Sequence, residues 1–587
     1  MNAHRGRRRP LTAALLLLTL SVLAGCTNAP PPPLVKPSPS SSPTTVPSKP
    51  PKPKEVVVGV GELRGGFNPH ALADISPATR ALSSLMLPSV FEPGPDGKPR
   101  LNTMLMESAE VVDDGKGRES GRFTVRYRIR TDAGWSDGAP LAAEDFVYLW
   151  KQLRSQPGVA EPAGYRMIHD VNSRQAGKTV EVSFSRPYPG WRQLFDNLLP
   201  AHLLQDAPGG WADALDDGYP ASAGPYAIRR VDLDRGEIVL MRNERYWGPP
   251  AKTDRIVLRA SDQSGQVEAL RSGDTGVALF RADAATMEDL RGLGDSVRLS
   301  TVPSPATTQL LLRPNSPRLS DRRVREAVVA ALDREALIDV GSGGGPGRQL
   351  PAHSQVLAPS ESGYQPTEPA GTFSGAPKPQ RVARLLTEAG YRRDGDVWSR
   401  DGHPLELVIA AQFRSEHYVR LAEATADQLR EQGIQARVIT PRGDELFGSM
   451  LPSDPLAEGK QRATVDMAIT PRPAGGDPAS MMASRWGCPA TSPSGGHSFP
   501  HNMAGFCDPL LQPTIEAALS GRIPFSEASS RVESTLWARA VALPLYQHAQ
   551  VLAISREVKG VEQGNGFASP LDTAGNWIGA PAETYDW

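Results

Sequence analysis

One charge-poor stretch near the carboxyl end carries residue types that suit ligand binding. Residues 470–488, TPRPAGGDPASMMASRWGC, hold Arg472, Asp477 and Trp486 among glycines and prolines. A guanidinium can donate paired hydrogen bonds to a carboxylate or phosphate, and an indole ring can stack on a sugar or an apolar side chain. We therefore predict that these three side chains face a binding cleft. The alternative is that Trp486 packs in the core and that Asp477 caps a helix beginning at Pro478.

Two cysteines in the same region allow two kinds of chemistry. Cys488 and Cys507 have His497 and His501 between them, at an H-x3-H spacing. A disulfide is the expected state of two thiols in an exported protein, and we favour it. A zinc site is the alternative, although neither cysteine belongs to a C-x2-C knuckle. We accordingly predict no bound metal.

The amino-terminal residues carry the evidence for export. Arginines among residues 5–9 precede the apolar run LTAALLLLTLSVLA, which is too short for a transmembrane helix and ends at Leu23-Ala24-Gly25-Cys26. This ending resembles a bacterial lipobox, which implies that residues 1–25 are a signal peptide and that Cys26 carries the lipid. An Arg-Arg pair leaves both the Sec and the Tat routes open.

A proline-rich segment follows the predicted lipid site. Residues 27–54 contain eleven prolines among Ser, Thr and Lys, and such a composition buries too little apolar surface to fold. Pro-rich chains prefer an extended conformation of about 3.1 Å per residue. We therefore expect residues 26–54 to be a tether that holds the folded part on the outer face of the cytoplasmic membrane.

Composition and motifs argue against several function classes. The net charge is −1 at pH 7, so nothing points to a nucleic-acid partner. Gly59 and Gly61 do not continue into a dinucleotide-binding G-x-G-x-x-G, because Arg64 occupies the third glycine position. The stretch 341–347 has glycine where a nucleophile elbow needs serine. We predict that the protein is not an enzyme and needs no cofactor.

The predicted elements that position these residues are strands and helices in alternation. Strand 405–411, the helix that ends at Gly433 and strand 434–439 predict a parallel βαβ unit. Strand 466–470 runs directly into the stretch described first, and α/β proteins bind ligands at the carboxyl ends of strands. Further strands are expected at 55–63, 123–130, 179–191 and 224–248, and further helices in 134–153, after Ser320 and at 379–391.

Two details of the predicted helices concern polar side chains. Glu144 and Asp145 fall in the first turn of the helix within 134–153, where the helix dipole favours acids, and we expect them on a solvated face. Ser320 is the expected N-cap of the next long helix, in which Val324 and Val328 share one face.

Five segments together resemble one family. They are GWSDGAPLAAEDFVYLW, AGPYAI, RNERYWG, DRRVREAVVAALDREALI and VARLLTEAGY. They resemble, in the same order, the family 5 extracytoplasmic solute-binding proteins of ABC importers for peptides and nickel. The resemblance implies a mixed α/β, two-lobed periplasmic-binding-protein-like fold with an interlobe cleft. Lobe I would take residues 55–305 and 550–587, and lobe II residues 306–549. It also implies a monomeric lipoprotein that delivers a small ligand, such as an oligopeptide, to permease subunits.

A narrower resemblance points to a different role. GFNPH, QPGVAEPAGY, RNERYWGPPAK and AGGDPASMMASRWGCPA are similar to the LpqW-type lipoproteins of actinobacteria, which are linked to assembly of mannosylated cell-envelope glycolipids. We add Phe67 and Asn68 of GFNPH to the expected ligand-binding residues. Peptide binders of the family often place an Asp four residues before the proline of the strand-end loop, where this chain has Ala474. Import and glycolipid assembly both stay open.

Overall fold

The structure, a computed structural model, describes residues 53–94, 97–114, 123–371, 375–453, 465–489, 502–564 and 568–581. Cys26, nearly all of the proline-rich segment, His497 and His501 lie outside these residues. Within them, no helix combines the length and the apolar character needed to cross a membrane.

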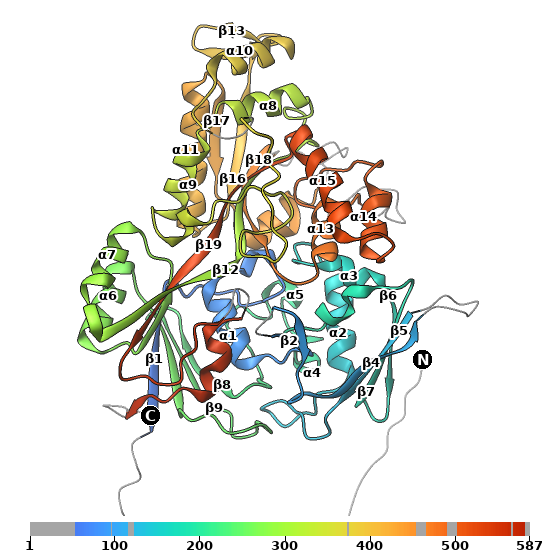
Figure 1. The fold of residues 1–587 in the computed structure, drawn as a ribbon, viewed down its shortest axis with the longest axis vertical. Coiled ribbons are helices and arrows are strands. Elements are labelled where there is room, and N and C mark those ends of the chain that lie inside the picture. The colour runs from blue at the N-terminus through green and yellow to red at the C-terminus, as the bar shows by residue number, and fades with distance from the viewer. Residues whose placement is uncertain are drawn as a thin grey trace, which may run out of the picture. The chain divides into compact units, whose positions relative to one another are not determined.

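A mixed sheet organises the fold (Figure 1). Among the described residues its strands follow the order β17-β16-β18-β12-β19-β11-β1-β10-β9-β8, with β20 paired to β1. A second sheet has the order β4-β5-β7-β6. The strands are β1 (Lys54–Val60), β2 (Phe91–Pro93), β3 (Pro99–Leu101), β4 (Met106–Asp114), β5 (Phe123–Ile129), β6 (Ile168–Arg174), β7 (Thr179–Phe184), β8 (Tyr226–Asp232), β9 (Glu237–Arg242), β10 (Arg255–Ala260), β11 (Val277–Phe280), β12 (Val297–Leu312), β13 (Arg392–Asp394), β14 (Val397–Arg400), β15 (His403–Pro404), β16 (Glu406–Ala411), β17 (Gln435–Ile439), β18 (Met467–Pro473), β19 (Ala542–Ser555) and β20 (Ala580–Pro581).

Helices cover the sheets and supply most of the apolar side chains that pack on them. Their amphipathic patterns follow the 3.6-residue period, as in α11, where Leu421, Ala422, Ala426 and Leu429 are buried. The helices are α1 (Pro77–Met86), α2 (Ala143–Ser155), α3 (Pro162–Met167), α4 (Ala201–Leu204), α5 (Gly210–Asp213), α6 (Gln263–Ser272), α7 (Ala284–Gly292), α8 (Arg322–Ala330), α9 (Arg334–Ser342), α10 (Pro379–Glu388), α11 (Glu416–Glu431), α12 (Gly443–Glu445), α13 (Pro478–Trp486), α14 (Gln512–Leu519) and α15 (Phe525–Arg539).

Two long antiparallel strands, β12 and β19, pair with each other and cross much of the fold (Figure 1). Both contribute side chains to the two largest hydrophobic cores. One core gathers side chains from β1, α1, α2 and β10, together with Leu552 and Trp577 near the carboxyl end. Another gathers side chains from α8, α10, α11 and β16, together with Leu310 and Leu543. The register of β12 against β19 shifts between Pro303 and Thr307, so the ladder is interrupted between the two cores.

The predicted βαβ unit is confirmed, since β16 and β17 are parallel and α11 connects them. The expected cap of α8 is wrong by one residue. Asp321 accepts a hydrogen bond from the amide of Arg323 at 2.8 Å, whereas the Ser320 hydroxyl donates back to the carbonyl of Pro317. A carboxylate at the N-cap also interacts favourably with the helix dipole, which explains why Asp321 takes the position.

The prediction that Asp145 is solvated is also wrong. Its side chain is buried, and its carboxylate accepts hydrogen bonds from the Trp135 indole at 3.2 Å and from the amides of Ala142 and Ala201 at 3.0 and 2.9 Å. Burial raises the pKa of the Asp145 carboxyl to about 6. The turn before α2 folds back over the helix start, so this acid holds the turn together while Glu144 remains exposed.

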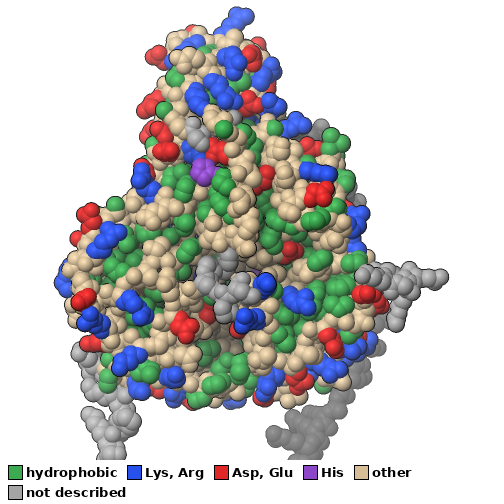
Figure 2. All heavy atoms as spheres, viewed as in Figure 1, with side chains coloured by type: hydrophobic (Ala, Val, Ile, Leu, Met, Phe, Trp, Pro, Cys, Tyr) green, Lys and Arg blue, Asp and Glu red, His purple; other side chains and the backbone are tan. Residues whose placement is uncertain are grey.

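Figure 2 shows Lys and Arg side chains interspersed with Asp and Glu over the viewed face. This mixture agrees with a net charge of −1. The distinctive charge pattern of the protein lies in its cavity.

Candidate functional site

A cavity of about 1750 Å³ lies at the ends of several strands of the large sheet. Its wall includes residues that follow β1, β11, β16 and β18, together with side chains from α1 and β19. Strands β1 and β11 are parallel, and so are β16 and β18, so each pair brings its carboxyl ends to one edge. The volume exceeds the range of roughly 300–1,000 Å³ of ordinary small-molecule sites.

The loop after β18 forms part of this wall, as its position at a strand end predicts. Residues 473–478 line the cavity. Gly475 and Gly476 have φ angles of 93° and 70°, a region that favours glycine. A Cβ on Gly476 would lie 2.7 Å from a carboxylate oxygen of Glu161, and the amide of Gly475 donates to Glu361 at 2.9 Å. The two glycines therefore allow the loop to approach two carboxylates closely.

Asp477 occupies the cavity wall and also caps α13. Its carboxylate accepts hydrogen bonds from the amides of Ala479 and Ser480 at 3.2 and 3.3 Å, which is the capping role considered from the sequence. The same side chain lines the cavity, and burial raises its pKa. The Tyr188 hydroxyl lies beside this carboxylate and partly opposes the rise in its pKa.

Arg472 and Trp486 do not face the cavity, so this part of the prediction is wrong. Strand β18 continues to Pro473 in register with β12, which places Arg472 inside the sheet instead of in the loop. Arg472 is 1% exposed and donates to the carbonyls of Ser354 and Leu357, both at 2.9 Å. Trp486 is 2% exposed and packs in a core with Met482. Both residues support the loop from behind.

Phe67 and Asn68 are likewise interior residues. They are 0% and 2% exposed and do not line the cavity, which corrects the expectation that they contact a ligand. The carbonyl of Phe67 accepts a hydrogen bond from Tyr219 at 2.7 Å, and Asn68 Oδ1 accepts one from the amide of His70 at 3.1 Å. The GFNPH turn therefore positions its last two residues, Pro69 and His70, on the wall.

Four carboxylates form one part of the cavity wall, which we name the acidic wall: Glu161, Asp196, Glu361 and Asp477. Burial raises the pKa of Glu161 to about 8, and the neighbouring Asp196 adds to the rise. On the side away from the cavity, the positive charge of Arg485 partly offsets these negative charges. Its guanidinium donates to the Pro473 carbonyl, and burial lowers its pKa to about 9.

Five side chains form a second part, which we name the basic wall: Arg64, Arg281, His417, Arg420 and His548. Arg281 donates to Nδ1 of His417 at 2.7 Å, and Arg64 donates to the Ser415 hydroxyl at 3.0 Å. Burial, followed by the charge of Arg281, lowers the pKa of His417 well below its usual value and that of His548 to about 3. Both imidazoles are therefore neutral at physiological pH.

The sequence analysis missed the basic wall because no motif marks it. Arg64 follows β1, Arg281 follows β11 and His548 lies in β19, and these three strands are neighbours in the sheet. His417 lies in the first turn of α11, just beyond the end of β16. The rule that ligands bind at the carboxyl ends of strands would have found Arg281 if β11 had been recognised.

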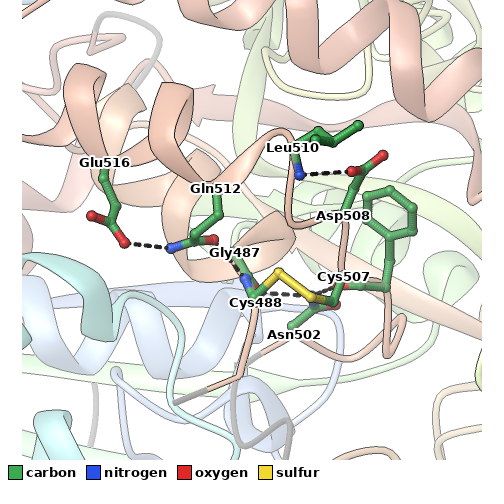
Figure 3. Close-up of a disulfide and its surroundings, with 9 residues drawn as sticks. Gly487, Cys488, Asn502, Cys507, Asp508, Leu510, Gln512 and Glu516 are labelled. Atoms are coloured by element: carbon green, nitrogen blue, oxygen red, sulfur yellow. Dashed lines mark hydrogen bonds between the residues drawn. A yellow bond between two sulfur atoms is a disulfide. The ribbon is translucent and has the colours of Figure 1, made fainter. Parts of the chain in front are cut away.

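The predicted disulfide is confirmed, since Cys488 and Cys507 are bonded to each other (Figure 3). The amide of Cys488 donates to Gln512 at 2.8 Å, and Asn502 donates to the Gly487 carbonyl at 3.0 Å. With both sulfur atoms in this bond, the cysteines are not zinc ligands in this structure. The disulfide instead fixes the end of α13 whose other end carries Asp477.

Several known proteins have sequences similar to this chain. The family model of bacterial extracellular solute-binding proteins, family 5 Middle, matches residues 101–493. A Mycobacterium tuberculosis protein named probable monoacyl phosphatidylinositol tetramannoside-binding protein LpqW is 34% identical over 96% of this chain and 97% of its own. The oligopeptide-binding protein OppA of Mycobacterium bovis is 26% identical over 81% of this chain and 76% of its own.

Solved structures show the same fold. The oligopeptide-binding protein AppA of Bacillus subtilis, in complex with a nonapeptide, matches with a TM-score of 0.68 at 17% identity, over 91% of this chain and 100% of its own. The periplasmic EDTA-binding protein EppA matches with a TM-score of 0.68 at 23% identity, over 90% and 97%. The predicted fold class is thus confirmed, and the chain belongs to the family 5 extracellular solute-binding proteins of bacteria, which are binding proteins and not enzymes.

Proposed function

We propose that the protein is a lipid-anchored extracytoplasmic binding protein that takes the headgroup of a mannosylated phosphoinositide-type glycolipid into its cavity. The observation that carries this proposal is the 34% identity to LpqW over nearly the whole of both chains. The match to the oligopeptide-binding relative is weaker and covers less of each chain.

The chemistry of the cavity supports a ligand with many hydroxyl groups. Among the residues that the structure describes, fourteen serines and threonines line it and no lysine does. Hydroxyl side chains both donate and accept hydrogen bonds, so they suit a polyhydroxylated glycan better than an apolar ligand. Tyr418 and Tyr546 also line the cavity beside His548, at ring-centroid distances of 6.0 and 5.7 Å from it.

The strand-end loop gives a further reason to prefer a glycan. Peptide binders that resemble this chain often use an Asp here to hold the free amine of a peptide, and this chain has Ala474 at that position. Asp477 is engaged as the cap of α13.

We include in the proposal the two lobes expected from the sequence, residues 55–305 with 550–587 and residues 306–549. The register shift in β12 between Pro303 and Thr307 falls at their boundary and supports a bending point there. Anchoring through Cys26 is part of the same proposal. Cys26→Ala should release the protein from the membrane fraction, and unchanged membrane attachment would refute the anchor.

The binding proposal is tested with the mature chain, residues 26–587, carrying Cys26→Ala. Isothermal titration with deacylated phosphatidylinositol mannoside should give saturable binding, and a panel of oligopeptides should give none. Peptide binding without glycan binding would contradict the proposal.

Peptide import through permease subunits is the second candidate, and the acidic wall favours it. Glu161 and Glu361 can together accept an ammonium group from a peptide. This function predicts that peptides with a free amino terminus bind and that their N-acetylated forms do not.

A further inference from the structure

The basic wall places positive charge at one part of the cavity without an acidic partner for each arginine. Arg64 is paired with Glu62. Among the described residues, no carboxylate lies within ion-pair distance of Arg281 or Arg420. Two acids nearby on the cavity wall are already engaged. Asp262 accepts from the amide of Gly265 at 2.8 Å, and Asp283 accepts from the amide of Thr286 at 2.8 Å.

His417 adds an oriented hydrogen-bond donor to these charges. Arg281 carries only donors, so Nδ1 of His417 must accept the 2.7 Å hydrogen bond between them. The ring is neutral, because burial and the nearby arginines lower its pKa well below the usual value. Its single proton is therefore on Nε2, and this atom has no hydrogen-bond partner among the described residues.

The N-terminal end of α11 also favours an anion at the basic wall. This helix of 16 residues begins at Glu416, and its N-terminal end carries a partial positive charge. Ser415 could cap it, but its hydroxyl accepts a hydrogen bond from Arg64 and makes no side-chain cap. Glu416 is the acid that opposes this field, and it is exposed.

We infer that the basic wall is a phosphate subsite, in which Arg281, with Arg64 and Arg420 and the Nε2 proton of His417, binds the phosphate of the captured ligand. Guanidinium groups form short paired hydrogen bonds with phosphate oxygens, and several converging cations suit a phosphate better than a single carboxylate. The inference deepens the proposed function and rests on it for the identity of the whole ligand. Such a subsite would orient the headgroup, with the phosphate at the basic wall and the glycan along the rest of the cavity.

The test uses small probes that contain the phosphate without the mannose chain. The mature chain with Cys26→Ala is titrated with glycerophosphoinositol, a phosphodiester, with inorganic phosphate and with acetate, and phosphorus NMR line broadening follows binding. Wild type should bind both phosphate probes and not acetate. Tighter binding of the diester would indicate a lipid headgroup as the source, and tighter binding of inorganic phosphate would indicate free phosphate.

Variants then locate the site. Arg281→Gln should weaken phosphodiester binding about tenfold, the loss expected for one charge-assisted contact of about 1.4 kcal/mol. His417→Ala should weaken it by a smaller factor. The control is Arg384→Gln, because Arg384 is exposed on α10 and does not line the cavity. Its affinity should equal that of wild type, and thermal unfolding checks that each variant is folded.

Three results would overturn the subsite: no phosphate binding by wild type, equal binding by Arg281→Gln and wild type, or acetate binding as tight as phosphate binding. Failure of the proposed function gives a different pattern. If the phosphate probes bind through Arg281 and the mannosylated headgroup does not bind, the subsite stands and the glycolipid assignment falls.

Discussion

The acidic and basic walls belong to one cavity, but they are built in different ways. The acidic wall gathers around a tight glycine loop and is backed by buried arginines, Arg472 and Arg485. The basic wall gathers at the ends of parallel strands, and Arg281 and Arg420 have no acidic partner among the described residues. Where a charge of opposite sign lies behind a cavity wall, the charge on that wall mainly supports the fold. A charge on the wall without such a partner is available to a ligand. The comparison therefore assigns the anionic part of the ligand to the basic wall.

The largest effect is expected behind the acidic wall. Trp486→Ala removes a buried indole from the core beneath the loop and should lower the unfolding free energy by about 3–5 kcal/mol. Chemical denaturation measures this loss. The molecules that remain folded should bind the ligand with nearly unchanged affinity. A large loss of affinity with normal stability would show that Trp486 contacts the ligand.

Charge reversal on the basic wall should act on binding instead of stability. Arg281→Glu replaces an attractive charge by a repulsive one and should weaken glycerophosphoinositol binding by about 30–100-fold, or roughly 2–3 kcal/mol. The unfolding free energy should stay close to that of wild type. If Asp196→Arg on the acidic wall had the same effect on affinity, the two walls would not differ as described.

The glycine loop should tolerate little change. Gly476→Ala forces a side chain onto a residue with φ of 70° and brings its Cβ to 2.7 Å from the Glu161 carboxylate. We expect a loss of stability of about 1–2 kcal/mol. Gly448→Ala is a suitable control, because a Cβ there meets no atom within 4 Å. Equal losses for both variants would show that the loop is not tightly constrained.

The pH dependence of stability should show the buried charge of the acidic wall. The pKa of Glu161 is raised to about 8, so between about pH 4.5 and 8 the folded state retains a proton that the unfolded state has lost. Stability therefore falls as pH rises through this window. Glu161→Gln removes this contribution and should be more stable than wild type at pH 8, with the difference decreasing toward pH 4.5. A pH-independent difference would contradict the raised pKa.

The smallest effect concerns the histidines of the basic wall. His548 has its pKa lowered to about 3 and His417 is lowered well below its usual value, so neither titrates between pH 5.5 and 7. Phosphodiester affinity should be constant across that range. A rise in affinity as pH falls through 6.5 would mean that a protonated histidine binds the anion.

The sequence predicts the acidic wall better than the basic wall, and the reason is physical. Local signals placed the loop of residues 473–478 at a strand end, because strand, glycine turn and Asp477 cap follow one another in the chain. The strand was expected to stop at Thr470, and its extra pairing with β12 moved Arg472 inside. That pairing depends on a partner more than 150 residues away in sequence, between Arg472 and Thr307.

The basic wall could not be predicted from local patterns. Its members come from four separate parts of the chain, and the strand order β19-β11-β1 brings Arg64, Arg281 and His548 together. The family resemblance supplied the fold class and the expectation of two lobes with a cleft. It did not supply Arg281 or His417, because neither lies in a segment that carries the resemblance.

The most direct test of the account is a crystal structure of the mature chain bound to deacylated phosphatidylinositol mannoside. The account predicts that the mannose chain occupies the cavity and that the phosphate lies within hydrogen-bond distance of the Arg281 guanidinium. A phosphate bound at the acidic wall, or a headgroup bound outside the cavity, would contradict it.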